Sequence, residues 1–410
     1  MPGDASHDPL GAWAASGIPH LTGRSDGPPI LPLGDAAVQA RRLTDWVRAA
    51  SGGSVDLDGA ALLAERAALT GFRRCGAVTP GGSGRLLPAT DGWVAVSCAR
   101  PDDPALLGAL VGRDVGDDPW PAVQEWVGGH TRAEFDERAT LLGIAGGGVA
   151  RDEEIVAASR GVQRPAGAVR EVAGMLVVDF SALWSGPLCA HLLGLAGARV
   201  VKVETPQRPD GARRGNAGFY RLLHGGHESV VLDPALPGER DALHRLVAAA
   251  DIVIEASRPR ALRRFGLDSA EFVASGGTWI SITAAGRDSD RIGFGDDVAA
   301  SAGLVVGDDA GMMFVGDAIA DPLSGLTAAA LAMCATNGGV LWDVSMRATV
   351  AATIGGPAPP PVRRYRERWI VESEWGAVDV LAPTPRAAIS AAPASGRDTV
   401  DVLARLGIPW

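Results

Sequence analysis

One stretch of the sequence limits what this chain can fold into more than any other. From Met175 to Glu204 it reads MLVVDFSALWSGPLCAHLLGLAGARVVKVE. Met175–Phe180 is a short, almost wholly apolar run rich in β-branched residues, which is typical of a parallel strand buried on both faces. Apolar residues then recur at helical spacing from Leu188, and Gly197 stands where a helix C-cap belongs. Ala198–Glu204 indicates a second strand, so the stretch predicts a βαβ unit.

The loop of this unit lies where a ligand is expected to bind. SALWSGP, residues 181–187, interrupts the apolar pattern with Ser, Gly and Pro. It follows the carboxyl end of the first strand, where open α/β sheets hold their ligands. The loop has a single glycine, whereas the GxGxxG dinucleotide fingerprint needs three. The sequence therefore argues against a dehydrogenase.

Further strands alternate with helices after this unit. VVLDP (Val230–Pro234), DIVIEAS (Asp251–Ser257) and GTWISITAAG (Gly277–Gly286) each indicate a strand, and a helix is expected from Gly238 to Ala250. This alternation predicts an α/β fold whose large domain is a doubly wound, Rossmann-like parallel sheet, accompanied by a smaller α+β domain.

The rest of the chain carries weaker signals. A helix is expected from Ala36 to Ala50, and Gly52–Leu69 reads as a strand running into a helix. Residues 15–23 and 51–64 weakly echo residues 300–307 and 337–351, which suggests a partial repeat. The proline-rich residues 382–396 predict irregular structure, and Asp398–Pro409 indicates a terminal helix.

Composition excludes several classes of function. The net charge of -10 argues against generic nucleic-acid binding. No apolar run reaches the roughly 18 residues that a membrane span needs, and the N-terminus lacks a basic, apolar signal peptide. Cys75, Cys98, Cys189 and Cys334 lack metal-ligand spacing and indicate buried thiols in a reducing cytoplasm. We therefore expect a cytoplasmic protein that binds neither nucleic acid nor membranes.

The βαβ stretch resembles the opening of the class III CoA-transferases, the family of formyl-CoA and carnitine CoA-transferases. Members open with a strand ending in Asp, an AGP or SGP turn, a helix reading LGA and a strand ending in Lys-x-Glu. The corresponding residues here are Asp179, Ser185-Gly186-Pro187, Leu195–Ala198 and Lys202–Glu204. The resemblance implies a transferase with coenzyme A as a substrate, acyl-CoA and a carboxylic acid as its reaction partners, and no permanently bound cofactor or metal. It also implies a homodimer, because family members are interlocked homodimers.

The family's other motifs occur here in a different order. In the family the nucleotide-binding half comes first, and a glycine loop and a small domain opening with DGY/W-V-A follow it. Here the glycine loop and DGWVAV lie at residues 81–96, ahead of the βαβ unit, while the tail pattern still closes the chain. The resemblance predicts three parts: 1–165 with the glycine loop, small domain and partial repeat; 166–380 with the Rossmann-like CoA-binding domain and catalytic Asp; and 381–410, a tail packing on the large domain.

Asp321, in GDAIADPLSG, is the candidate catalytic residue. Pro322 suits the first position of a helix, which would make Asp321 its N-cap. Capping alone explains this pattern and contributes about 1 kcal/mol. In class III CoA-transferases, however, an Asp before a Ser/Thr-Gly helix start is the nucleophile, and Ser324-Gly325 match that start. The resemblance therefore implies that Asp321 is catalytic, and we expect the helix dipole and amides to keep its carboxylate ionised.

The resemblance also implies a reaction route. Asp321 attacks an acyl-CoA thioester to give a mixed anhydride, the released CoA thiolate returns to form an aspartyl-CoA thioester, and the acceptor acid takes the CoA. Covalent catalysis of this kind divides one difficult exchange into easier steps. Backbone amides of glycine-rich loops are expected to stabilise the tetrahedral oxyanions.

Two loops are implied to contact CoA. Leu183, Trp184 and Ser185 occupy the loop that packs on CoA in relatives, and Ala256 and Ser257 occupy a second such loop. Trp184 is equally well explained as a core residue.

Two further candidates concern the nucleotide. Arg264 matches an arginine near the nucleotide in the family, although a solvated helix face explains it as well. His227 and Glu228 stand where the family often has a phosphate-contacting lysine and an arginine, which weakens the case for tight CoA binding there. His224 and His227 form a poor metal site, because no further ligands are nearby in the sequence.

Two N-terminal features complete the candidate set. Gly81, Gly82 and Gly84 match the mobile glycine loop that covers the reacting Asp in some members, and a plain linker is the alternative. Asp35 lies roughly where a second nucleophile would stand, but it lacks the Ser-Gly helix start and is expected to be structural or vestigial.

Two other functions stay open. Acyl-CoA racemases share the fold but use a His in a G-H-D motif, whereas this chain reads GFGDDVAAS, with Asp296 and Asp297 and no histidine. An aspartate is a poor base for an α-proton without a large pKa shift, so transfer is favoured. The other alternative is a non-catalytic acyl-CoA-binding protein that kept the fold.

Overall fold

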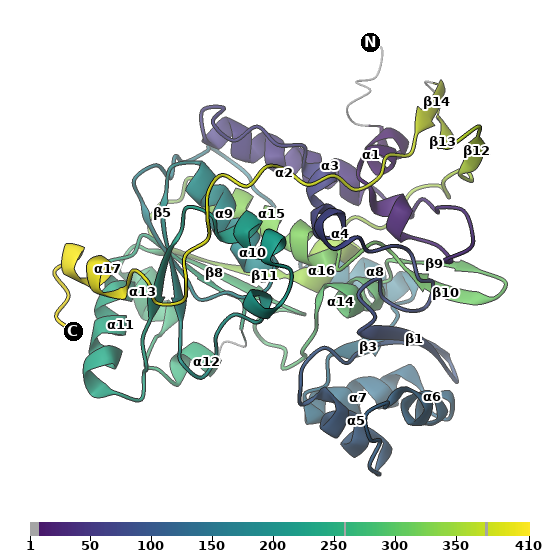
Figure 1. Cartoon of the computed structure of the whole chain (residues 1–410), viewed down its shortest axis with the longest axis horizontal. Helices are drawn as coiled ribbons and strands as arrows, with labels where there is room; N and C mark the ends of the chain where they lie inside the picture. The colour runs from purple at the N-terminus through teal and green to yellow at the C-terminus, as the bar shows by residue number, and fades with distance from the viewer. Residues whose placement is uncertain (1–7, 258–259, 374–375) are drawn as a thin grey trace.

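The computed structural model describes residues 8–257, 260–373 and 376–410 (Figure 1). At its centre is a six-stranded parallel sheet with the strand order β11-β8-β7-β4-β5-β6. The strands are β4 (Leu176–Asp179), β5 (Arg199–Glu204), β6 (Glu228–Val231), β7 (Ile252–Glu255), β8 (Thr278–Thr283) and β11 (Val340–Ser345). If these six strands are numbered 1 to 6 along the chain and read from the β6 edge, their order is 3-2-1-4-5-6. This is the doubly wound arrangement, and its switch point lies between β4 and β7. The predicted parallel α/β sheet is therefore confirmed.

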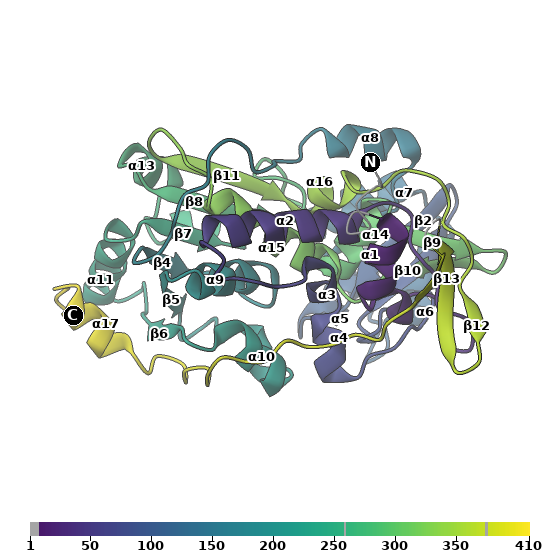
Figure 2. The same cartoon turned by 90° about the horizontal axis from the view of Figure 1, so that it is seen from above.

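Helices cover both faces of this sheet (Figures 1 and 2). The helices from β4 onward are α9 (Ser185–Leu195), α10 (Ala217–His224), α11 (Pro237–Ala248), α12 (Arg260–Arg263), α13 (Ser269–Ala274), α14 (Gly295–Ser301), α15 (Ala320–Ala332), α16 (Met346–Ala351) and α17 (Thr399–Arg405), with the 3-10 helix η3 (Gly211–Arg214). Successive strand residues enter opposite cores. Val177 joins the core that contains α9 and α15, whereas Val178 joins the core that contains α11 and α17.

The N-terminal helices share the first of these cores. They are α1 (Pro9–Ala15), η2 (Ile18–Leu21), α2 (Ala36–Ala50), α3 (Gly59–Leu62) and α4 (Glu65–Thr70). The predicted helix Ala36–Ala50 is confirmed, and it packs along α15 (Figure 2). The strand expected after Gly52 is wrong, because Gly52 and Gly53 both take positive φ angles and close α2 instead.

A separate small unit carries its own core. It contains β1 (Gly84–Ala89), β2 (Gly92–Ser97) and β3 (Gly146–Gly148) in an antiparallel sheet, with α5 (Asp103–Val111), α6 (Trp120–Gly128) and α7 (Arg132–Leu142). Helix α8 (Asp152–Ser159) follows the small unit and packs against α16 and the first core. The smaller α+β domain is therefore confirmed. Strand β3 consists of three glycines and so has no side chains that favour a strand. A Cβ on Gly146 would lie only 2.5 Å from the Ala95 oxygen, which is too close for any other residue. Glycine is needed there for close backbone approach rather than for flexibility.

The C-terminal segment crosses the molecule. A β9 (Val305–Asp308) and β10 (Gly311–Phe314) hairpin precedes α15, and β12 (Arg363–Tyr365), β13 (Arg368–Ser373) and β14 (Gly376–Asp379) follow α16. An irregular stretch then runs from β14 to α17 (Figure 2), as the prolines predicted. Arg386 pairs with Glu65 at 2.9 Å, and Asp398 accepts the Ser229 N–H at 2.8 Å. The division at residues 165 and 380 stays a prediction.

Expectations from composition have mixed outcomes. No helix in the described ranges is long and apolar enough to cross a membrane. Residues 1–7, part of the stretch used to argue against a signal peptide, lie outside those ranges. Cys189 and Cys334 are buried as expected, but Cys75 is exposed, so the prediction is wrong for that thiol.

A substitution at Gly325 tests how closely α15 packs on α9. A Cβ at this position would lie 2.5 Å from the backbone oxygen of Ser185. Because backbone cannot yield as a flexible side chain can, we expect Gly325→Ala to lower the free energy of unfolding by about 1–3 kcal/mol in urea titrations. Gly128→Ala is the control, since it is also helical and its Cβ meets nothing within 4 Å. Equal effects of the two substitutions would contradict this packing.

Candidate active site

The two loops expected to contact CoA meet at the switch point of the sheet. Residues 180–184 follow β4, Ala256 and Ser257 follow β7, and β4 and β7 are hydrogen-bonded neighbours. Ala256 is exposed and Leu183 is 41% exposed, whereas Trp184 and Ser185 are buried. Trp184 packs edge-on to Phe219 in the core. Ligands of open α/β sheets bind at such a crevice, but the assignment of these residues to CoA stays a prediction.

Buried charges hold the loop after β4. Leu183 has a φ of 71°, a left-handed conformation that costs a non-glycine residue on the order of 1–3 kcal/mol. Its N–H donates to Asp210 Oδ1 at 3.0 Å. Lys202 Nζ donates to the Ser181 oxygen at 2.6 Å and pairs with Asp210 Oδ2 at 2.9 Å. Lys202 of the Lys-x-Glu motif is thus an anchor for this loop and is only 1% exposed.

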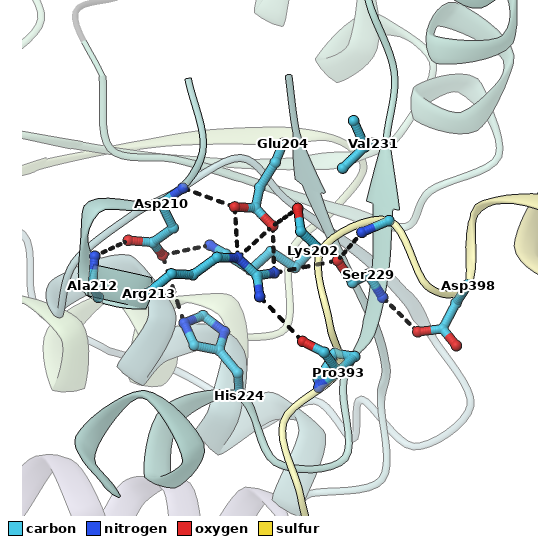
Figure 3. A network of polar contacts seen from close by, with 12 residues as sticks. Lys202, Glu204, Asp210, Ala212, Arg213, His224, Ser229, Val231, Pro393 and Asp398 are labelled. Atoms are coloured by element: carbon cyan, nitrogen blue, oxygen red, sulfur yellow. Dashed lines mark hydrogen bonds and ion pairs between the residues drawn. The ribbon is translucent and has the colours of Figure 1, made fainter. Parts of the chain in front are cut away.

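The same network reaches the C-terminal segment (Figure 3). Glu204 accepts the Asp210 N–H at 2.7 Å and pairs with Arg213. Burial acts to raise the pKa of Glu204, but the hydrogen bonds from Arg213 and Asp210 outweigh burial and lower it. Arg213 also donates to the Pro393 oxygen at 3.1 Å. The loop after β4 is therefore tied to the tail through charged side chains.

Asp321 lies in the first turn of α15. The helix begins at Ala320 with Ile319 as its N-cap, so the prediction that Asp321 is the N-cap is wrong. The tight turn before the helix, in which Ala318 has a φ of 48°, starts the helix earlier than Pro322 suggested. Asp321 is partly exposed.

Three more carboxyl groups and one arginine lie near Asp321. Asp296 and Asp297 stand in the first turn of α14, and Asp317 precedes α15. Arg66, from α4, forms a two-pronged pair with the fully buried Asp317, with Nε to Oδ2 at 2.8 Å. Ion pairs of this forked geometry are the strong ones.

Arg66 also connects this acidic cluster with the loop after β4. Its guanidinium carbon lies 5.1 Å from the centre of the Trp184 ring, within the range of a cation–π contact. Its side chain remains 27% exposed. The carboxylates of Asp317, Asp296 and Asp321 outweigh burial and raise the pKa of Arg66. Sequence reasoning missed Arg66, because one arginine on an N-terminal helix carries no motif.

Burial changes the protonation of the cluster. It raises the pKa of Asp321 to about 7, although Arg66 and the Gly295 N–H oppose this shift. Burial likewise raises the pKa of Asp296 to about 7 and that of Asp297 to about 6. Burial thus opposes the effect expected of the helix dipole and amides on Asp321, because desolvation disfavours the ionised carboxylate.

Close backbone approach shapes the site. A Cβ on Gly295 would lie 2.5 Å from Asp321 Oδ2 and 2.4 Å from the Ala318 oxygen, so only glycine fits. The Ala318 N–H donates to Asp296 Oδ1 at 2.7 Å. Ser97 of the small unit donates to Asp297 Oδ1 at 2.6 Å. The cluster thus lies where α14, α15 and the small sheet meet, and Asp321 can act chemically as a nucleophile or a base near pH 7.

The nucleotide candidates lie elsewhere. His227 is 4% exposed, with ring centres 5.8 Å and 5.6 Å from His191 and His224. Burial lowers the pKa of His227 to about 3, so the ring is neutral at pH 7. Arg264 is exposed in the turn after α12. Their roles toward CoA stay predictions. No group of His, Cys, Asp and Glu among the described residues could hold a metal ion.

The N-terminal candidates also lie on different elements. Gly81 and Gly82 are exposed in the turn before β1, and Gly84 is the first residue of β1. Asp35 precedes α2, accepts a hydrogen bond from Gln39 Nε2 at 2.8 Å and lines a cavity of about 760 Å³. Asp321 does not line that cavity. A role for the glycine loop in covering Asp321 stays a prediction.

The acidic cluster predicts a pH-dependent stability. Because the pKa of Asp296 is higher in the folded state than in the unfolded chain, the folded state binds more protons between about pH 4 and pH 7. The free energy of unfolding therefore falls as pH rises through this window. In Asp296→Asn this fall should be smaller, by on the order of 1–4 kcal/mol, in denaturant titrations at several pH values. The exposed Asp309→Asn should keep the slope of the unmodified protein; an unchanged slope in Asp296→Asn would rule out this assignment.

The pair of Arg66 and Asp317 predicts a large loss of stability. Arg66→Gln leaves Asp317 buried without a cation, so the free energy of unfolding should fall by about 3–5 kcal/mol. Arg66→Lys keeps the charge but loses the forked geometry, so its free energy of unfolding should lie between those of the unmodified protein and Arg66→Gln. Arg41→Gln removes a more exposed pair with Asp58 and should cost at most about 1 kcal/mol. Similar losses in Arg66→Gln and Arg41→Gln would contradict a structural role for the buried pair.

Comparisons with known proteins find similarity over part of the chain. Formyl-CoA:oxalate CoA-transferase of Afipia carboxidovorans is 31% identical over 100 residues, 23% of this chain and 24% of that protein. Succinyl-CoA–D-citramalate CoA-transferase of Chloroflexus aurantiacus is 30% identical over 154 residues, 35% of this chain and 38% of that protein. The chain thus matches well under half the length of these relatives.

Solved structures and a family model were also compared. A CAIB/BAIF family protein from Brucella suis aligns with a TM-score of 0.42 at 24% identity, covering 51% of this chain and 65% of that chain. A hypothetical protein from Mycobacterium tuberculosis aligns with a TM-score of 0.45 at 25% identity, covering 50% and 66%. The model described as CoA-transferase family III matches residues 172–358, which include β4 to β11 and Asp321. This match to CoA-transferase family III agrees with the resemblance that the motifs predicted.

Proposed function

We propose that this protein transfers CoA from an acyl-CoA thioester to a free carboxylic acid, with Asp321 as the nucleophile. One observation supports this activity most directly. Asp321 is a partly exposed residue within the segment that matches the family model, and it lies near Arg66, which contacts Trp184 of the loop expected to bind CoA. The proposed nucleophile, a cation and the loop expected to bind CoA are therefore near one another.

The reaction proceeds through two acyl exchanges on Asp321. A carboxylate oxygen of Asp321 attacks the thioester carbon, the C–S bond breaks, and CoA thiolate leaves a mixed anhydride. The thiolate attacks the Asp321 carbonyl carbon, releases the donor acid and leaves an aspartyl-CoA thioester. The acceptor carboxylate then attacks this thioester to form a second anhydride, and the thiolate finally attacks the acceptor's carbonyl to give the new acyl-CoA and free Asp321. No proton, water or redox partner is consumed.

The surroundings of Asp321 suit these steps. A pKa of about 7 leaves roughly half of the groups ionised at neutral pH and makes the carboxylate more basic than an ordinary aspartate. The charge of Arg66 favours the ionised form and the anionic intermediates. The Gly295 N–H, which also acts on Asp321, is a donor for developing negative charge.

Two further parts of the proposal rest on the family resemblance. We propose a cytoplasmic protein and a homodimer, because these are the properties expected of the family. Light scattering coupled to gel filtration gives the mass directly, and a monomer at micromolar concentration would refute the dimer.

Oxygen labelling tests the covalent route. The acceptor acid's attack leaves one of its oxygens on Asp321, so a single turnover with a ¹⁸O-labelled acceptor should add one ¹⁸O to the peptide containing Asp321, and repeated turnover should label both carboxylate oxygens. The first pairs to try are formyl-CoA with oxalate and succinyl-CoA with D-citramalate, the substrates in the names of the relatives. Hydroxylamine added during turnover should give a hydroxamate on the same residue.

Matched variants separate chemistry from folding. Asp321→Asn should lose transfer by at least about 10³-fold while keeping its far-UV circular dichroism. Asp309 is an exposed aspartate outside the cluster, so Asp309→Asn should keep full activity, and its label should appear only on Asp321. Turnover without label in Asp321, or an active Asp321→Asn, would remove Asp321 from this role.

The pH profile gives a second prediction. Because the nucleophile is the ionised form and burial raises the pKa of Asp321 to about 7, kcat/KM should rise with pH through about 7 and then level off. A rate that is already constant from pH 5 upward would show that Asp321 titrates normally or is not the nucleophile.

Epimerisation of an acyl-CoA is the second candidate function. The raised pKa of Asp321 supplies what an aspartate needs to remove an α-proton, which an ordinary aspartate lacks. A chiral 2-methylacyl-CoA incubated in D₂O distinguishes the two activities. Deuterium at C2 with loss of optical purity supports epimerisation, whereas CoA transfer leaves C2 unexchanged.

A further inference from the structure

A second cavity lies on the side of α15 away from the acidic cluster. It has a volume of about 240 Å³ and lies between α2, residues 162–165, α15 and α16. Figure 2 shows α2 lying along α15. Leu43, Leu323, Thr327 and Thr349, all buried, contribute to its lining. The buried part of the lining therefore combines leucine side chains with threonine side chains.

Two polar atoms beside this cavity have no partner within the protein. Trp46 Nε1 and Gln163 Oε1 are both buried and make no hydrogen bond to any described residue, and both residues line the cavity. A buried donor or acceptor without a partner costs about 1–3 kcal/mol. One N–H donor and one amide oxygen acceptor thus remain for a bound molecule.

Two unpaired arginines also line the cavity. Arg42 on α2 and Arg164 are exposed, and neither makes an ion pair or hydrogen bond with the described residues. Both guanidinium groups are therefore available to a bound molecule beside the cavity. This charge favours a ligand with an anionic group.

We propose that this cavity binds a small carboxylic acid with a hydroxyl or amide group on a short apolar body. Its carboxylate faces Arg42 and Arg164 and accepts the Trp46 N–H, while its hydroxyl or amide N–H donates to Gln163. At roughly 30 Å³ per water molecule the cavity holds about eight waters. An acid with a comparable number of non-hydrogen atoms therefore fits, whereas a CoA thioester does not.

The cavity is distinct from the site around Asp321. Leu323 and Thr327 line it from α15. Asp321 is two residues before Leu323, which places the two side chains about 200° apart around the helix. Asp321 instead lies against Gly295 of α14. A ligand here contacts the same helix as Asp321 from its other face, and its binding does not depend on the proposed transferase activity.

Binding is tested with the intact protein and small probes. 3-Hydroxybutyrate is titrated by calorimetry and by the tryptophan fluorescence that Trp46 contributes, and 3-hydroxybutyramide serves as the neutral control. Saturable binding of the acid but not of the amide is expected. Arg42→Gln with Arg164→Gln should weaken it at least about tenfold, and Trp46→Phe should weaken it by a similar factor while removing most of the fluorescence change.

Two controls keep the result interpretable. Arg48→Gln removes another exposed arginine of α2 that pairs with Asp56 and does not line this cavity, so it should bind the acid normally. Asp321→Asn should also bind it normally. The proposal would be overturned by a lack of saturable binding in the millimolar range or by equal binding of acid and amide. It would also be overturned if the double arginine variant bound the acid as well as the unmodified protein does, or if only Asp321→Asn lost binding. The last outcome would place the acid at the transferase site instead.

Discussion

The pair formed by Arg66 and Asp317 is the interaction on which the candidate site depends. Asp317 is fully buried just before α15, and a carboxylate there is tolerated only because the Arg66 guanidinium meets it with two hydrogen bonds. Arg66 comes from α4, more than 200 residues earlier in the chain. The same guanidinium lies 5.1 Å from the Trp184 ring. One cation therefore holds together the N-terminal helices, the start of α15 and the loop after β4.

A second buried cation shapes the other side of the crevice. Lys202 is 1% exposed and joins the Ser181 oxygen to Asp210, which in turn holds Leu183 in a left-handed conformation. The family motif at Lys202 and Glu204 thus has a structural explanation in this chain. Lys202 pairs with Asp210 and holds the loop after β4, while Glu204 pairs with Arg213, which contacts the tail.

The protonation of the acidic cluster decides which chemistry is available. Four aspartates share one arginine, so burial outweighs the opposing charge and the pKa values of Asp296 and Asp321 rise to about 7. A carboxylate at this value is both a better nucleophile than an ordinary aspartate and a usable base. This is why transfer and epimerisation are both chemically open at Asp321, and why the position of the substrate carbonyl relative to this oxygen separates them.

By itself the sequence determined the local order of the sheet region. The βαβ unit, the later strands, the helix Ala36–Ala50 and the family resemblance all followed from apolar periodicity and short motifs, because these depend on neighbouring residues. Only the tertiary structure decided the strand order, the glycine strand β3, the early start of α15 and the partnership of Arg66 with Asp317. Each of these depends on residues far apart in the chain. The raised pKa of Asp321 belongs with them, since burial comes from packing and no local pattern encodes it.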